Sequence, residues 1–271
     1  MRVALIVPLA LLAACSVSND PQASASASPK ASTVPVPVAA PSVSAQTPVA
    51  ARNVTVENDA YEFSYSYPAE AGAIPALRAL LDEDLEKERT ELISDSKEGQ
   101  EDARKNGYPF NAYSHSIEWQ VVTDMPAWLS MSTLVGYFSG GAHPNYGYEA
   151  LLWDKIAGLG RQPTDLFTSK AALAAAIRDP FCKELEKERA KKRGNEKWGG
   201  DISEFTKCID PTEQTVILGS SNGKAFNRIG VLISPYAAGP YAEGSYEVTV
   251  PVTAKVLAAV RPEYKATFVA Q

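Results

Sequence analysis

Aromatic and polar residues alternate at the beginning of the folded part of the chain. The run YEFSYSY, residues 61–67, has the period of two that is typical of a half-buried strand. Leucines at helical spacing follow, from Leu77 to Leu92, and predict a helix. The segment 96–107, SKEGQEDARKNG, is almost entirely polar, and we expect the helix to fray into a loop there.

The rest of the chain alternates between strand-like blocks and helical blocks. Helices are expected over 169–179, with Ser169 as N-cap, and over 181–194, separated because Asp179-Pro180 stops one helix and starts the next. A short helix is expected within 252–260. Strands are expected within 114–124, 127–140, 146–156, 215–219, 226–234 and 246–250. Since strands and helices come in blocks without a βαβ rhythm, the pattern predicts an α+β fold with antiparallel sheets flanked by two or three helices.

The first fifteen residues have the pattern of an export signal. Arg2 is followed by a short apolar run that is too short to span a membrane, and Leu-Ala-Ala precedes Cys15. This ending resembles the lipobox of bacterial lipoproteins, in which the cysteine is lipidated. We therefore expect a signal peptide at 1–14, a lipid anchor on Cys15 and an extracytoplasmic location. Ser16 after the cysteine favours the outer membrane, facing the periplasm, if the cell has two membranes.

A tether follows the anchor. Residues 15–52 are rich in Ala, Ser, Pro and Val and contain no aromatic residue, so they cannot bury enough apolar area to offset the entropy of ordering. We expect a disordered tether here and a folded head over 53–271, with possible sub-halves at 53–139 and 140–271.

Composition narrows the function classes. The formal net charge is −6, so without a basic patch we expect no nucleic-acid partner. Two His and three Cys leave no material for a closed zinc site, and we expect no metal and no cofactor. Cys182 and Cys208 are the two thiols of the head, and in an exported domain we interpret them as a disulfide. A reactive thiol is the alternative, but both histidines are far away in sequence.

Two loops carry candidate binding residues. The segment FSGGAHPNYGY places His143, Asn145 and Tyr146 on a glycine-containing loop. His143 is a candidate for ligand contact, for a structural contact that holds the turn, or for a general base with Glu149 or Asp154 as orienting carboxylate. The second loop, 235–244, is stiffened by Pro and Gly and presents two tyrosines. Tyr236 and Tyr241 either form a binding platform or cover the end of a sheet.

Three segments carry a family resemblance: GGAHPN at 140–145, DLF at 165–167 and SPYAAGPYAEGSYEVTVP at 234–251. They resemble the PdaC/RsiV-like extracytoplasmic domain family, a group of largely unknown function. It includes the ectodomain of a lysozyme-sensing anti-sigma factor and the non-catalytic region of a peptidoglycan deacetylase. The resemblance implies an α+β head that recognises cell-wall components or lysozyme-like proteins. It transfers no catalytic residue.

These patterns together favour a cell-envelope lipoprotein whose head is a binding domain and not an enzyme. The expected partners are the membrane, through the N-terminal lipid, and either peptidoglycan or a lysozyme-like wall hydrolase. The candidate contacts are His143, Asn145, Tyr146, Tyr236 and Tyr241. Two alternatives stay open: a cell-wall polysaccharide or peptidoglycan hydrolase, or deacetylase-associated enzyme, that uses His143, and a structural lipoprotein of an envelope assembly.

Overall fold

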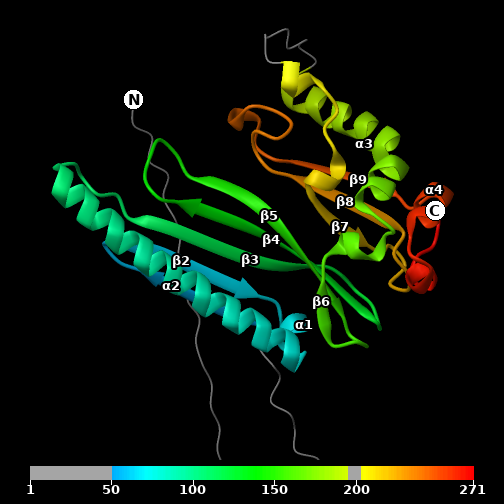
Figure 1. Cartoon of the computed structure of the whole chain (residues 1–271), viewed down its shortest axis with the longest axis horizontal. Helices are drawn as coiled ribbons and strands as arrows, with labels where there is room; N and C mark the ends of the chain where they lie inside the picture. The colour runs from blue at the N-terminus through cyan, green and yellow to red at the C-terminus, as the bar shows by residue number, and fades with distance from the viewer. Residues whose placement is uncertain (1–50, 195–202) are drawn as a thin grey trace, which may run out of the picture. The chain divides into compact units, whose positions relative to one another are not determined.

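The computed structural model of this chain describes residues 51–194 and 203–271. The expected signal peptide at 1–14, the lipidation site Cys15 and nearly all of the tether lie outside the described residues. The head contains two β-sheets with helices against them, so the α+β prediction is confirmed (Figure 1).

The larger sheet has six strands in the order of the sequence. Its strands are β1 (Arg52–Glu57), β2 (Tyr61–Tyr67), β3 (Tyr113–Asp124), β4 (Trp128–Phe138), β5 (Asn145–Asp154) and β6 (Leu159–Arg161). All neighbours are antiparallel except β2 and β3, which are parallel. The expectation of purely antiparallel sheets was wrong at this pair. A helical connection between them, α1 (Ala69–Gly72) and α2 (Pro75–Asn106), returns the chain to the end at which β2 began, as a parallel pair requires.

Helix α2 is unbroken to Asn106, so the expectation that residues 96–107 fray was wrong. Ser96 and Ala103 are buried within this polar segment, which shows that the helix still packs against the protein there. Gly107 adopts a left-handed conformation, with φ of 74°, and its N–H donates to Ala103 O as a C-cap. Tertiary packing and a cap therefore extend the helix beyond its leucine stripe.

Along one face of the larger sheet lies α2 (Figure 1). Its leucines pack on the aromatic residues that alternate along β2 and on the apolar residues of β3 to β5. The buried members from the sheet are Phe63, Tyr65, Tyr67, Ile117, Trp119, Leu129, Met131 and Trp153. The period-two pattern of the sequence thus places one face of the strands under α2 and the polar residues on the opposite face.

The smaller sheet packs on part of that opposite face. Its antiparallel strands are β7 (Thr215–Gly219), β8 (Arg228–Ile233) and β9 (Tyr246–Pro251). Ile217 and Leu232 contact Ala150 of the larger sheet, and this small cluster joins the two sheets. The other face of the smaller sheet is covered by α3 (Lys170–Arg193) and by the C-terminal segment with α4 (Ala254–Ala259).

Helix α3 runs through Pro180 without interruption, so the expected break at Asp179-Pro180 was wrong. Ser169 is the N-cap as predicted, with Oγ accepting from Ala172 N. A proline inside a helix costs about 3 kcal/mol. Leu173, Ile177, Phe181 and Leu185 are all fully buried at four-residue spacing, and their burial on both sides of the proline offsets that cost.

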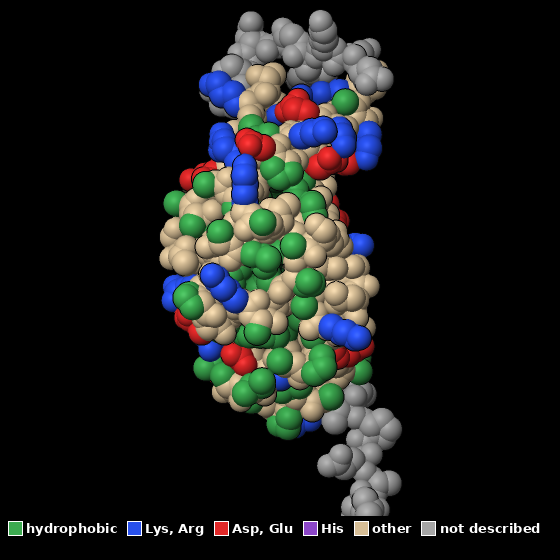
Figure 2. All heavy atoms as spheres, turned by 90° about the vertical axis from the view of Figure 1, so that its right-hand side faces the viewer, with side chains coloured by type: hydrophobic (Ala, Val, Ile, Leu, Met, Phe, Trp, Pro, Cys, Tyr) green, Lys and Arg blue, Asp and Glu red, His purple; other side chains and the backbone are tan. Residues whose placement is uncertain are grey.

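On the side of the molecule shown in Figure 2, charged side chains gather near the top, where α3 ends.

The division proposed between residues 139 and 140 falls in the connection between β4 and β5, which pair with each other. Short 3₁₀ helices occur at Pro163–Leu166, Ser203–Thr206, Pro211–Glu213, Tyr241–Glu243 and Pro262–Thr267. None of the helices in the described part of the chain is both long enough and apolar enough to cross a membrane.

Candidate functional site

The β4–β5 loop and the β8–β9 loop, nearly a hundred residues apart in sequence, meet at one end of the head. The imidazole of His143 stacks on the ring of Tyr241, with ring centroids 4.0 Å apart and an interplanar angle of 25°. The ring of Tyr236 lies 5.5 Å from that of Tyr241, and its hydroxyl is 3.4 Å from His143 Nε2. The structure thus brings three of the five candidate residues into one cluster of rings, here called the ring cluster.

A hydrogen bond to the backbone and an unusual backbone conformation position the ring cluster. The Tyr241 hydroxyl donates to Pro144 O at 2.7 Å, which ties one loop to the other. Tyr236 has a φ of 69°, and it is the one residue other than glycine with a positive φ in the described part of the chain. Its side chain is 50% exposed, so no buried contact compensates directly for this conformation. Backbone strain of this kind costs about 1 to 3 kcal/mol and is concentrated at functional sites.

Asn145 and Tyr146 lie at the start of β5 and point to opposite faces of the sheet. Tyr146 is on the side of the smaller sheet, where its hydroxyl accepts from Ser245 N at 3.1 Å. Gly244 precedes that amide with a φ of 66°, and a Cβ there would lie 3.1 Å from the Tyr146 hydroxyl. Asn145 instead donates through Nδ2 to the Tyr137 hydroxyl at 3.0 Å. Tyr146 therefore supports the β8–β9 loop, and Asn145 borders the α2 side.

The C-terminal end of α3 holds the loop that carries Tyr236 and Tyr241. Lys192 Nζ donates to Glu243 O at 2.6 Å and also to Ser245 O. The guanidinium of Arg193 binds both carboxylate oxygens of Glu243, at 2.8 and 3.0 Å, and each side chain of this pair is only 9% exposed. Tyr246 donates its hydroxyl to the same carboxylate.

Electrostatics at Glu243 follow from these contacts. Burial works to raise the pKa of the Glu243 carboxyl, but the hydrogen bonds from Arg193 and Tyr246 outweigh burial and hold the pKa below its ordinary value. Burial, followed by the hydrogen bond to Glu243, raises the pKa of the Tyr246 hydroxyl above its usual value. Glu243 is therefore a stable anion that anchors the loop.

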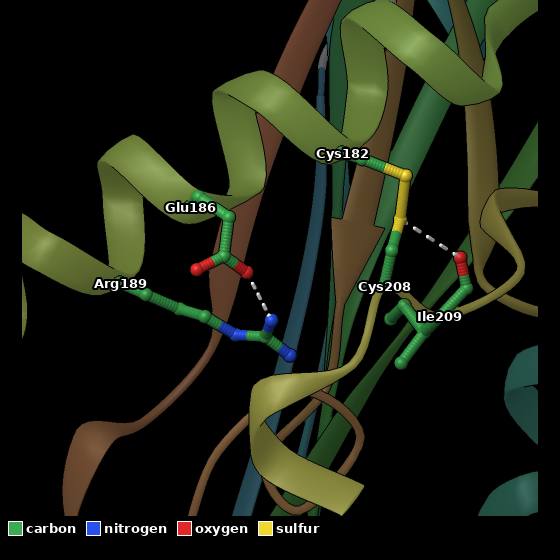
Figure 3. The surroundings of a disulfide bond; sticks show 5 residues. All are labelled: Cys182, Glu186, Arg189, Cys208 and Ile209. Atoms are coloured by element: carbon green, nitrogen blue, oxygen red, sulfur yellow. Dashed lines mark hydrogen bonds and ion pairs between the residues drawn. A yellow bond between two sulfur atoms is a disulfide. The ribbon is translucent and has the colours of Figure 1, made fainter. Parts of the chain in front are cut away.

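Cys182, which precedes Lys192 on the same helix, forms a disulfide with Cys208 (Figure 3). The two Cα atoms are 5.5 Å apart, so the predicted pair is present in the structure. Arg189, two turns beyond Cys182, is almost fully buried, donates through Nε to Ala238 O at 3.0 Å and contacts Glu186. From Cys182 to Arg193, α3 thus carries a disulfide and three basic side chains that hold the loop.

Neither carboxylate considered as an orienting partner for His143 lies beside it. Glu149 is on the face of β5 that α2 covers, opposite to Tyr146, and its pKa is raised first by burial and then by Asp84 and Glu88. Asp154 is at the far end of β5, where it accepts from Ala157 N and Arg161. In the described part of the chain, the polar contacts of His143 are Pro144 O and the Tyr236 hydroxyl. Among the same residues, no three His, Cys, Asp or Glu side chains are placed to hold a metal ion.

The residues that support the site have no distinguishing pattern in the sequence. Lys192 and Arg193 stand in a run of helical charges, and nothing in that run distinguishes them from solvent-exposed neighbours. Glu243 and Ser245 lie in the aromatic loop, but their partners are determined only when α3 and β5 come together.

Part of the chain is similar to a known protein family. Residues 54–146 match the family model described as Deacetylase PdaC. The match confirms the resemblance indicated by the sequence, and it includes His143, Asn145 and Tyr146 but ends before Tyr236 and Tyr241. No curated protein matches this chain.

Two crystal structures of DUF3298 family proteins are also similar to this chain. One is a member from Bacteroides fragilis NCTC 9343, with 17% identity, a TM-score of 0.46, and coverage of 76% of this chain and 92% of that chain. The other is from Pseudomonas aeruginosa PAO1, with 13% identity, a TM-score of 0.49, and coverage of 83% of this chain and 99% of that chain.

Proposed function

We propose that this protein is a lipid-anchored, non-catalytic binding module of the cell envelope, and that the ring cluster binds the glycan of peptidoglycan. The observation that carries the proposal is the arrangement of His143, Tyr236 and Tyr241, in which His143 and Tyr236 are exposed, Tyr241 is half-buried, and the Tyr241 hydroxyl ties the two loops together. Aromatic side chains with few rotatable bonds give a large contact area at low entropic cost, and their faces suit the apolar faces of sugar rings.

The cost of building the ring cluster supports a role in binding. Tyr236 keeps a strained φ although its ring is half exposed, and α3 contributes buried charges to hold the same loop. If the loop served only to cover the end of a sheet, glycine at position 236 would adopt the positive φ without strain. The strain is instead consistent with presenting a tyrosine ring to a ligand.

Contacts of His143 favour binding over catalysis. A histidine that acts as a general base needs an unprotonated ring nitrogen that can reach the substrate, and a carboxylate commonly orients its ring. Here the imidazole is stacked on Tyr241, and its ring nitrogens face a backbone carbonyl and a tyrosine hydroxyl. This environment suits a ring that completes a binding surface.

The test is sedimentation of the purified chain with insoluble peptidoglycan. Tyr236→Gly removes one ring while relieving the positive φ, so folding stability should not fall. We expect Tyr236→Gly and Tyr241→Ala each to weaken binding by about five- to thirtyfold, as hot-spot aromatic residues do. Tyr108→Ala is the matched control, because Tyr108 is also 50% exposed but lies beyond the end of α2.

Unchanged binding in the Tyr236→Gly/Tyr241→Ala double variant would refute the proposed site. Release of soluble wall fragments by the wild type, abolished in His143→Ala, would favour the hydrolase alternative. A cationic wall hydrolase is a second candidate ligand, favoured by the net charge of −6. That candidate would be supported if the chain bound no peptidoglycan but captured purified lysozyme at low salt and released it at high salt.

A further inference from the structure

The face of the larger sheet opposite α2 is only partly covered by the smaller sheet. Across the strands, Thr55, Ser64, Ser116, Gly136 and Tyr146 are paired neighbours, so they form one row on this face. The adjacent row contains Ser66, and the one on the other side contains Ser114. We call this surface, made of Thr55, Ser64, Ser66, Ser114, Ser116 and Gly136, the serine face.

Within the described residues, the serine hydroxyls of the serine face are not engaged by other side chains or by the backbone. A Cβ at Gly136 would lie 2.6 Å from Ser116 Oγ, so no larger side chain fits there without displacing the serine. In the described part of the structure, the side chains of Ser64, Ser66, Ser114 and Ser116 form no hydrogen bond. Small polar residues add little cross-strand contact to a sheet, and sheet stability therefore does not account for this row.

Three carboxylates border the serine face. Glu57 and Glu62 are opposite each other on β1 and β2, and Glu118 is next to Ser66. All three are exposed, and none forms an ion pair in the described part of the chain. A hollow of about 290 Å³ lies over this end of the face, and no Lys or Arg lines it.

The row of small residues leads to the candidate site. From β1 to β5 it crosses four inter-strand spacings, a length of about 19 Å. It ends at Tyr146, whose hydroxyl accepts from Ser245 N in the loop that carries Tyr241. A linear polymer held at the ring cluster can therefore continue across the serine face.

We propose that the serine face binds a stretch of glycan that carries free amino groups, which rests on the proposed function of the ring cluster. Ammonium groups complement these three carboxylates, of which Glu118 also accepts a hydrogen bond from Gln120 Nε2 at 3.3 Å. Sugar hydroxyls and amines exchange hydrogen bonds with the serine hydroxyls, which both donate and accept. The ligand is thus a β-linked aminosugar strand that lacks part of its N-acetyl groups.

The experiment compares binding of two soluble oligomers of equal length to the purified full chain, one of glucosamine and one of N-acetylglucosamine. We expect the glucosamine oligomer to bind about tenfold more tightly at low salt. Glu57→Gln/Glu62→Gln/Glu118→Gln should remove this preference without weakening the N-acetylated oligomer. The matched control, Glu83→Gln/Glu98→Gln/Glu101→Gln, changes the net charge equally on exposed positions of α2 and should keep the preference.

Equal affinity for the two oligomers would overturn this proposal while leaving the proposed function intact. Loss of the preference in both triple variants would also overturn it, since net charge and not the serine face would then be responsible. If neither oligomer binds, the proposal is wrong, and sedimentation with peptidoglycan decides separately about the ring cluster. Salt-sensitive lysozyme binding that only the Glu57/Glu62/Glu118 variant loses, without an oligomer preference, would assign the face to a cationic protein instead.

Discussion

Replacing Glu243 by glutamine removes the anion that fixes the β8–β9 loop to α3. The amide oxygen of glutamine can still accept hydrogen bonds, but the contact of Arg193 with two carboxylate oxygens, at 2.8 and 3.0 Å, is lost together with the charge. Because both partners are only 9% exposed, solvent does little to replace that contact. We expect a loss of about 2 to 3 kcal/mol in the free energy of unfolding.

Thermal unfolding followed by circular dichroism measures this loss. For a domain of this size, each kcal/mol lowers the Tm by about 2 to 4 °C, so the Tm should fall by about 4 to 12 °C. Glu184→Gln is the control, because Glu184 forms an exposed pair with Lys187 on the same helix. Exposed pairs contribute about 0 to 1 kcal/mol, and the control should lower the Tm by only a few degrees at most.

The pH dependence adds a second measurement. The pKa of Glu243 is lower in the folded protein than its ordinary value of 4.5, so the ionised carboxylate contributes its full stability above that pH. The contribution is lost as the pH falls through the folded-state pKa. The difference in stability between the wild type and Glu243→Gln should therefore be largest near neutral pH and shrink in acid. A Tm for Glu243→Gln equal to that of Glu184→Gln at pH 7 would refute the reasoning.

Three further predictions concern other parts of the chain. Cys182→Ala/Cys208→Ala should lower the free energy of unfolding by about 3.5 kcal/mol in denaturant titrations, and reductant should then have no effect on the variant. Gly99→Ala should destabilise the head by about 1 to 3 kcal/mol, because the new Cβ would overlap the Tyr113 hydroxyl. Helix propensity alone predicts the opposite, a gain of about 1 kcal/mol, so a higher Tm would show that Tyr113 moves aside without cost. Cys15→Ala should abolish incorporation of labelled fatty acid in cells, whereas labelling that persists would place the lipid elsewhere.

The sequence predicted most strands because at least one face of each of them is buried. Alternation in 61–67 predicted β2 correctly, and the longer runs predicted β3, β4 and β5. Alternation does not determine the direction of a neighbouring strand, so the parallel pairing of β2 with β3 was missed. The strand β1 was also missed, since its two valines are only half buried and the run follows directly on the tether.

The candidate site was predicted in its parts and not in its assembly. Glycine, proline and aromatic residues marked both loops, and His143, Tyr236 and Tyr241 do meet there. Their meeting depends on how the smaller sheet packs against the larger one, which no local pattern encodes. Lys192 and Arg193 were likewise indistinguishable from other charges of the helix, because their partners are on a different element.

The wrong prediction at Pro180 bears directly on the site. A helix that ended there would leave the segment from Cys182 to Arg193 free to turn about the disulfide, and the basic residues would have no fixed position relative to the β8–β9 loop. Because α3 is continuous, the buried side chains before the proline fix the direction of the half that follows it. Arg189 and Arg193, four residues apart, then reach Ala238 and Glu243 on the two sides of Tyr241. The continuity of the helix through Pro180 is therefore what allows the loop to keep Tyr236 in its strained, exposed conformation.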